Sequence, residues 1–143
     1  MKSAVELAKI LLVDDDLASR LTLQTVLRAS GYMVDSAASA AEAVDKLDHS
    51  EYELVLSELR MESPEAGYRV IAHARTMDYK PATAIITTTY RSSGRADSLR
   101  PESSVLIEPQ DVPGLLDGVA HLISNRATKR VTRSLRRPLA AAG

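Results

Sequence analysis

The chain has 143 residues, of which 45% are hydrophobic and 26% charged, with a formal net charge of −1, so the composition fits one globular domain. It has no Cys, which excludes disulfides, thiolate metal sites and Cys nucleophiles, and no Phe or Trp, so the core must be aliphatic. With so few aromatic side chains, stacking platforms for single-stranded nucleic acid are not expected. No apolar run is long enough to span a membrane or form a signal peptide, and we expect a cytoplasmic protein.

Short apolar runs recur along the chain, and segments with helical spacing separate them. In chain order, these runs predict strands at residues 9–13, 32–34, 54–57, 84–88 and 105–107. Helices are expected at residues 17–30, from Ser39 to about 47, at 68–77 and after Pro113, with a short or irregular helix within 91–102. Ser39 and Glu42 have the spacing of a capping box. Strands that alternate with helices indicate an α/β fold with a parallel sheet covered on both faces.

Polar side chains stand where several of these strands end. Three Asp residues at 14–16 follow the first strand, and Glu58 follows the third. Thr88 closes the fourth strand, and Glu108 follows the fifth. Because ligands of an open parallel sheet bind at the carboxyl ends of its strands, we expect these side chains to share one site.

Four motifs give the chain a resemblance to the response-regulator receiver domain of two-component signalling. They are LLVDDD (11–16), LVLSELRM (54–61), IITTTY (85–90) and LIEP (106–109), in the order and approximate spacing of that family. The resemblance implies a receiver-like (flavodoxin-like) doubly wound sheet of five parallel strands in the order 2-1-3-4-5, with helices on both faces. It divides the chain into an N-terminal extension (1–8), a receiver-like domain (9–125) and a basic C-terminal tail or helix extension (126–143).

The resemblance also implies roles for the residues at the strand ends. In the family, two acids after the first strand help to bind Mg²⁺, an Asp after the third accepts a phosphoryl group, and a Thr or Ser and a Lys contact that group. Asp14 and Asp15 match the acid pair, and Thr88 matches the hydroxyl. Glu58 stands at the phospho-acceptor position and Glu108 at the position of the Lys. Two of the five chemical parts are therefore changed.

Both changes act on phosphoryl transfer directly. The extra methylene of Glu moves the carboxylate by roughly 1.5 Å, and errors of about 1 Å can cost ~10²-fold in rate. Glu108 removes a cation that would stabilise the transferred charge and adds repulsion in its place. Glu58 either imitates the phosphorylated state with its own charge, or the site is retired, or the residue is only a solvated strand-end acid; the sequence leaves these readings open.

Four carboxylates, from Asp14, Asp15, Glu58 and Glu108, are expected to form an acidic pocket. Like charges at short range should raise the pKa of at least one of them. Oxygen ligands suit Mg²⁺ or Ca²⁺, with Asp15 and Glu58 as the candidate ligands, although no cofactor is required. The alternative for the three Asp residues is a plain N-cap cluster for the helix that begins at Leu17.

Basic residues gather near the C-terminus, beyond the last acid, Asp117. They are Arg126, Lys129, Arg130, Arg133, Arg136 and Arg137. If the last helix continues past Asn125, it carries an apolar stripe at Ala127, Val131 and Leu135; the alternative is a disordered, solvated tail. Such a segment suits an anionic partner: a nucleic-acid backbone, a membrane surface or an acidic protein face.

The combined pattern predicts a signalling and interaction module rather than an enzyme, one that acts independently of phosphorylation because Glu58 and Glu108 replace the Asp and the Lys. Its expected partner is a protein of a signalling pathway, such as a histidine kinase or an output protein, and a homodimer stays open. Two alternatives remain: an atypical receiver that is still phosphorylated in a phosphorelay, and a nucleic-acid-binding regulator that uses the basic tail.

Overall fold

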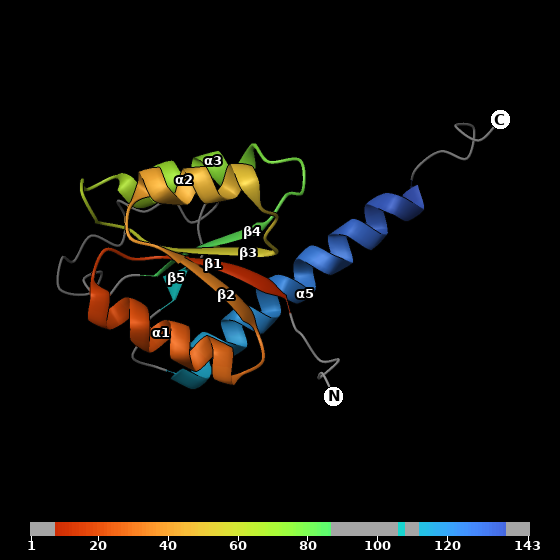
Figure 1. The fold of residues 1–143 in the computed structure, drawn as a ribbon. Helices are drawn as coiled ribbons and strands as arrows, with labels where there is room; N and C mark the ends of the chain where they lie inside the picture. The colour runs from red at the N-terminus through yellow and green to blue at the C-terminus, as the bar shows by residue number, and fades with distance from the viewer. Residues whose placement is uncertain (1–7, 87–105, 108–111, 137–143) are drawn as a thin grey trace.

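The computed structural model describes residues 8–86, 106–107 and 112–136. These residues form a central sheet with helices on both faces (Figure 1). In chain order the elements are β1 (Lys9–Val13), α1 (Leu17–Ala29), β2 (Met33–Ala37), α2 (Ala40–His49), β3 (Leu54–Glu58), α3 (Ala66–Arg75), β4 (Ala82–Ile86), β5 (Leu106–Ile107) and α5 (Val112–Arg136).

The sheet has five parallel strands in the order β2-β1-β3-β4-β5, which confirms the predicted order. Its central strands, β1 and β3, are buried on both faces, and this explains their continuous apolar runs, ILLV and LVL. In the pairing between them, Ile10 lies opposite Leu54 and Val13 opposite Ser57. The two strands therefore end side by side, and each is followed or closed by an acid.

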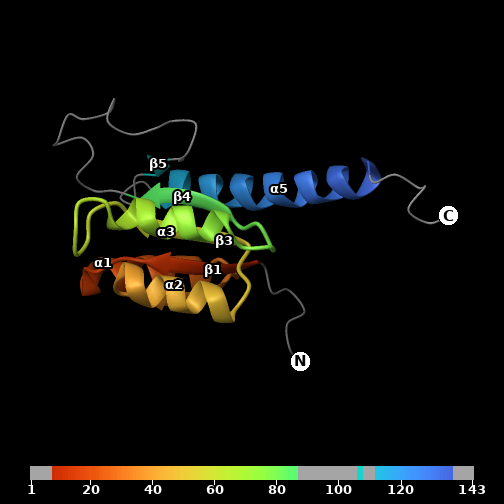
Figure 2. The same ribbon diagram turned by 90° about the horizontal axis from the view of Figure 1, so that it is seen from above.

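Each face of the sheet supports its own apolar core. On one face, Leu12 and Leu56 belong to a cluster that includes Leu27 of α1 and Leu115 of α5. On the other face, Val55 packs in a cluster with residues of α2 and α3. Figure 1 shows the same division, with α2 and α3 on one side of the sheet and α1 and α5 on the other, and Figure 2 looks down on the side that α2 and α3 cover. Alternate residues of each strand thus supply the two cores.

Several boundaries differ from those predicted. Strand β2 continues to Ala37, because its five residues pair with all five of β1 and its second half buries Ala37. Helix α3 begins two residues early, at Ala66, which is fully buried against the second core. Strand β4 begins two residues early, at Ala82, since Ala82 pairs with Leu54 of β3. The end predicted for that strand, at Thr88, and the helix predicted within 91–102 lie outside the described residues.

Helix capping follows the sequence closely. The Ser39 hydroxyl accepts the Glu42 N–H at 3.1 Å, as the capping-box spacing predicts. The Glu42 carboxylate returns to the N–H of Ala38 at 2.8 Å, one residue before the N-cap itself. Asp16 caps α1, since its carboxylate accepts the Ser19 N–H at 2.9 Å. The N-cap interpretation of the Asp cluster therefore holds for its third member.

Helix α5 is 25 residues long and extends well past the rest of the fold (Figure 1). Its first half is held by Leu115 and Val119, which are buried in the core. Farther along, Val131 is 58% exposed and Leu135 is 80% exposed, so the apolar stripe of the second half has no cover within the described residues. No helix in the described ranges has the length and apolar character needed to cross a membrane.

Candidate functional site at the carboxyl ends of β1 and β3

Two acids of the predicted pocket stand at neighbouring positions of the sheet. Val13 of β1 pairs with Ser57 of β3, so the next residues of these two strands are Asp14 and Glu58. Both are largely buried: Asp14 is 4% exposed and Glu58 is 9% exposed. This agrees with the expectation that the first and third strands deliver their carboxylates to one end of the sheet.

The three Asp residues after β1 have different surroundings. The Asp14 carboxylate accepts the Asp16 N–H at 3.0 Å, while the Asp14 backbone N–H donates to the Ala37 carbonyl and its own carbonyl accepts from Arg20 at 2.7 Å. Asp15 is exposed. Asp16 is exposed and occupied with capping α1. A run of three identical residues thus supplies one buried acid, one solvent-facing acid and one helix cap.

The environment of Asp14 changes its ionisation. Burial raises the pKa of the Asp14 carboxyl above its usual range, and the charges of Asp15 and Asp16 raise it further. The hydrogen bond from the Asp16 N–H and the charge of Arg20 act in the opposite direction. The expected raised pKa is therefore found, but its largest cause is loss of water and not repulsion between carboxylates.

A glycine, Gly67, allows α3 to pack closely against the backbone of Glu58. A Cβ built on Gly67 would overlap the Glu58 carbonyl oxygen and would lie 2.7 Å from the Leu59 Cα, both of which are backbone atoms. The Gly67 N–H donates to the Leu59 carbonyl at 2.9 Å, which draws the start of α3 against the end of β3. Only a residue without a side chain permits this contact. A role for Gly67 was not predicted from the sequence, because the contact joins a strand end to a helix eight residues farther on.

Glu62, on the loop after β3, was also missed as a structural residue. Its carboxylate accepts the N–H of Ala40, the first residue of α2, at 3.1 Å. The same oxygen lies 3.4 Å from Arg69 of α3. A carboxylate at the start of α2 is favoured because the first N–H groups of a helix have no partner within it. Glu62 therefore connects the loop to both helices on this face of the sheet.

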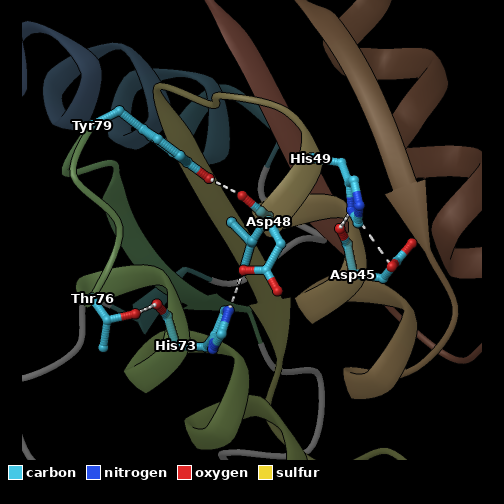
Figure 3. Close-up of polar contacts among 7 residues, drawn as sticks. Asp45, Asp48, His49, His73, Thr76 and Tyr79 are labelled. Atoms are coloured by element: carbon cyan, nitrogen blue, oxygen red, sulfur yellow. Dashed lines mark hydrogen bonds and ion pairs between the residues drawn. The ribbon is translucent and has the colours of Figure 1, made fainter.

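Two of the three histidines, His49 and His73, take part in contacts within and between α2 and α3 (Figure 3). His73 Nε2 lies 2.8 Å from the Asp48 carboxylate and joins the two helices, while His49 Nδ1 lies 2.7 Å from the Asp45 carbonyl within α2. Each of these contacts involves a single acidic residue. In the part of the chain that the structure describes, no three His or acidic residues are grouped as a metal site would need.

The remaining members of the predicted site lie outside the described residues. Thr88 and Glu108 are both among them, so their place beside Asp14 and Glu58 stays a prediction. Of the basic segment, Arg126, Lys129 and Arg130 lie on α5. Arg133 and Arg136 belong to the end of the same helix by their backbone, and Arg137 is outside the described range.

Comparison with known proteins identifies the family. Residues 10–102 match the family described as the response regulator receiver domain. The match covers more than half of the chain, so this protein belongs to the receiver-domain family. Receiver domains are signalling modules that work with histidine kinases and output domains.

Two curated relatives agree with this assignment. The transcriptional regulatory protein ZraR of Klebsiella oxytoca is 32% identical over 88 residues, which cover 62% of this chain and 19% of ZraR. The response regulator protein FleR of Pseudomonas aeruginosa is 31% identical over 115 residues, which cover 79% of this chain and 24% of FleR. The chain spans about a fifth to a quarter of the length of the curated relatives it matches.

Solved structures agree on the fold. A receiver domain protein (CheY-like) of Methanospirillum hungatei has a TM-score of 0.70 at 20% identity, covering 87% of this chain and 99% of that one. The response regulator TrrA of Thermotoga maritima, in complex with Mg(2+)-BeF, has a TM-score of 0.57 at 24% identity, covering 70% of this chain and 84% of TrrA.

Proposed function

We propose that this receiver domain is a non-catalytic signalling module that acts by protein contact and without phosphorylation at Glu58. The observation that carries the proposal is the residue at the end of β3. By the resemblance of its motif, Glu58 matches the position where the family carries its phospho-acceptor Asp, and it is 9% exposed beside the buried Asp14. The site therefore already contains a carboxylate that is longer than Asp by one methylene.

The chemistry of transfer supports this proposal. Phosphoryl transfer depends mostly on positioning and on electrostatic stabilisation of the transferred group. A nucleophile displaced by about 1 Å can lose ~10²-fold in rate. The substitution of Glu108 for the family's Lys takes away a cation, and the burial of Asp14 makes an added dianion still more costly.

A permanent negative charge at Glu58 offers a function for the changed site. The longer side chain can carry its charge toward the place where a phosphoryl oxygen would lie in a phosphorylated receiver. The domain would then present one conformation to its partner at all times. The partner that we propose is a histidine kinase or an output protein, with the basic residues of α5 available to an acidic surface on it.

A metal is not part of this proposal. Carboxylate oxygens are ligands that Mg²⁺ accepts, with Asp15 and Glu58 as the candidates. The described residues provide no group of three such side chains, and the proposed contact with a protein partner does not require a metal.

Incubation of the full chain with a small phosphodonor and Mg²⁺, followed by intact mass measurement, tests the proposal. We expect no added phosphoryl group on the native chain. The double variant Glu58→Asp with Glu108→Lys should accept one phosphoryl group. Either change alone should give a smaller fraction of phosphorylated chains. The controls are the native chain and Glu58→Gln.

A phosphoryl adduct on the native chain that disappears in Glu58→Gln would show an atypical receiver still active in a phosphorelay. That result would overturn the proposal. A pull-down from cell extract with the full chain, and with a chain lacking residues 126–143, then separates partners of the receiver body from partners of the basic segment.

A further inference from the structure

A second candidate site lies at the opposite end of the sheet from Glu58. A pocket of about 300 Å³ is formed where the turn before β4 meets the middle of α5. Ala82, the first residue of β4, lies in its wall, whereas Glu58 pairs with Ile86, the last residue of that strand. The two sites are therefore separated by the length of a strand.

Four basic residues line this pocket. They are Lys80 from the turn and Arg126, Lys129 and Arg130 from α5. Thr83 and Asn125 add uncharged polar groups to the lining, and Leu122 adds an apolar one. No acid is among the described residues that line it. A concave site with convergent donors and one sign of charge is suited to an anion.

Arg126 is fixed in place by the backbone of the turn. Its Nε donates to the Lys80 carbonyl at 2.9 Å, and its Nη2 donates to the Tyr79 carbonyl at 2.7 Å. A guanidinium has five N–H donors in a rigid plane, so two bonds of this kind orient the group and leave others to reach a ligand. A preoriented cation loses less conformational freedom when it binds.

The turn itself adopts an unusual backbone conformation. Lys80 has a φ of 47°, in the left-handed region that side-chain-bearing residues seldom occupy. Its N–H donates to the Met77 carbonyl at 3.1 Å, and its carbonyl accepts from Arg126, so both of its backbone groups are bonded. Such a conformation persists only where its surroundings hold it, and the Lys80 ammonium also donates to the Arg75 carbonyl at 3.2 Å.

Among the described residues, acids offset the positive charge of the pocket only in part. Within the described ranges, the ion pairs involve Lys9, His49, Arg69 and His73 and none of the four basic residues of the pocket. Burial lowers the pKa of the Arg126 guanidinium, and the charge of Arg130 lowers it further, while Glu53 and Glu51 partly oppose this. An anion bound between these cations would relieve their repulsion.

We propose that this pocket binds a small molecule through a phosphate group. The volume lies at the small end of the ligand-site range, roughly 300–1,000 Å³, which favours a compact ligand over a macromolecule. A guanidinium edge that the backbone does not already occupy suits two oxygens of one phosphate, and the lysines add positive charge for a dianion. This inference does not depend on the proposed function of the acidic site.

Titration of the full chain with pyrophosphate, and separately with ATP, tests the inference by amide NMR at about 0.15 M salt, where long-range attraction is screened. Divalent cations are left out, so the acidic site does not contribute. We expect saturable shifts at the amides of Thr83 and Asn125. Lys129→Gln with Arg130→Gln should weaken binding by at least ~10-fold, since charge-assisted bonds to the ligand are lost.

A double variant with the same change in charge provides the control. Lys46→Gln with Arg69→Gln alters α2 and α3, on the other face of the sheet, and should leave the affinity unchanged. Lys129 and Arg130 are exposed, so their replacement should leave the fold intact, and a melting curve checks this.

Three results would overturn the inference. The first is the lack of saturable shifts at the pocket amides with either probe. The second is an equal loss of affinity in both double variants, which would mean attraction by net charge alone. The third is binding to a single-stranded oligonucleotide or to phosphatidylglycerol vesicles, but not to pyrophosphate or ATP, which would assign the basic surface to nucleic acid or to lipid.

Discussion

Neighbouring residues of one type can have different physical roles, and Asp14 and Asp15 show this most clearly. They are adjacent and chemically identical, yet the first is 4% exposed and the second faces solvent. A buried carboxylate loses its hydration, while an exposed one keeps it. The contribution of each acid to stability therefore depends on its position at the strand end.

The ionisation of Asp14 should reduce stability near neutral pH. Because its folded pKa is raised, the folded state holds a proton over a window in which the unfolded state does not, and stability falls as pH rises through that window. Asp14→Asn keeps an oxygen that can accept the Asp16 N–H and removes the buried charge. We expect a larger free energy of unfolding at pH 7 and a weaker pH dependence above about pH 4.

Urea denaturation at several pH values, with chelator present, measures this effect. Asp15→Asn is the matched control, and we expect it to change stability by less than about 0.5 kcal/mol because Asp15 is exposed. A loss of stability in Asp14→Asn at pH 7 would mean that the charged form of Asp14 is favoured by the fold.

Gly67 is the second residue whose replacement should have a definite effect. A methyl group there would meet the carbonyl of Glu58, and backbone atoms cannot rotate away as a side chain can. We expect Gly67→Ala to cost about 1–3 kcal/mol, as overpacking does in a well-packed interior. Thermal melting should show the loss, and amide shifts should show a displaced strand end at Glu58.

Gly114→Ala, at an exposed position in the first turn of α5, serves as the comparison. That change should be neutral or slightly stabilising, because Ala favours a helix more than Gly does. If Gly67→Ala is equally neutral, α3 does not pack as closely against the end of β3 as described.

Among the elements, helix α5 has one half packed in the core and one half exposed to solvent. Its first half completes a core with α1 and the sheet, and Arg126 at its middle bonds to the turn before β4. Beyond Arg126, most described side chains are exposed, so this half should add little to the stability of the domain.

Two truncated chains separate these contributions. A chain that ends at Arg130 keeps the bonds of Arg126 and should melt within a few degrees of the full chain. A chain that ends at Asn125 loses them and should be less stable by roughly 1.5–3 kcal/mol, the usual range for a hydrogen bond that involves a charged group. Circular dichroism melts compare the three chains.

Equal stability of the two truncated chains would show that Arg126 does not hold α5 to the turn. A collapse of the fold in the chain that ends at Arg130 would show instead that the second half of α5 is part of the core, contrary to its exposure.

For the whole molecule, the charge distribution is uneven, with acids at the carboxyl ends of β1 and β3 and bases on α5. Asp14 and Glu58 are neighbours on adjacent strands, and Asp15 is next to them in sequence. Carboxylates this close oppose each other's ionisation. A cation that binds the folded state relieves the repulsion between them.

We therefore expect a higher melting temperature with millimolar Mg²⁺ or Ca²⁺ than with chelator. A ligand at about 100 times its dissociation constant adds ~2.7 kcal/mol to stability, so even weak binding is measurable. Glu58→Gln should reduce the gain, and Glu53→Gln, at the other end of β3, should not. If neither cation changes the melting temperature, the carboxylates do not form a cation site.

Local patterns allowed the sequence to predict most elements and the strand-end position of Glu58. Strand periodicity, the Ser39–Glu42 spacing and the apolar runs of β1 and β3 depend on nearby residues, and the structure agrees with them. The resemblance to receiver domains supplied the strand order, which periodicity cannot give. The local features can be predicted from the sequence because neighbours along the chain determine them.

Only the tertiary structure decided which residues meet across long separations. It brings Glu62 to the first turn of α2, Gly67 against the backbone of Glu58, and Arg126 to the carbonyl of Lys80. It also buries Asp14 while leaving Asp15 in solvent. Burial and close contact depend on how helices pack on the sheet, and that packing is a property of all the elements together, which no short stretch of sequence contains.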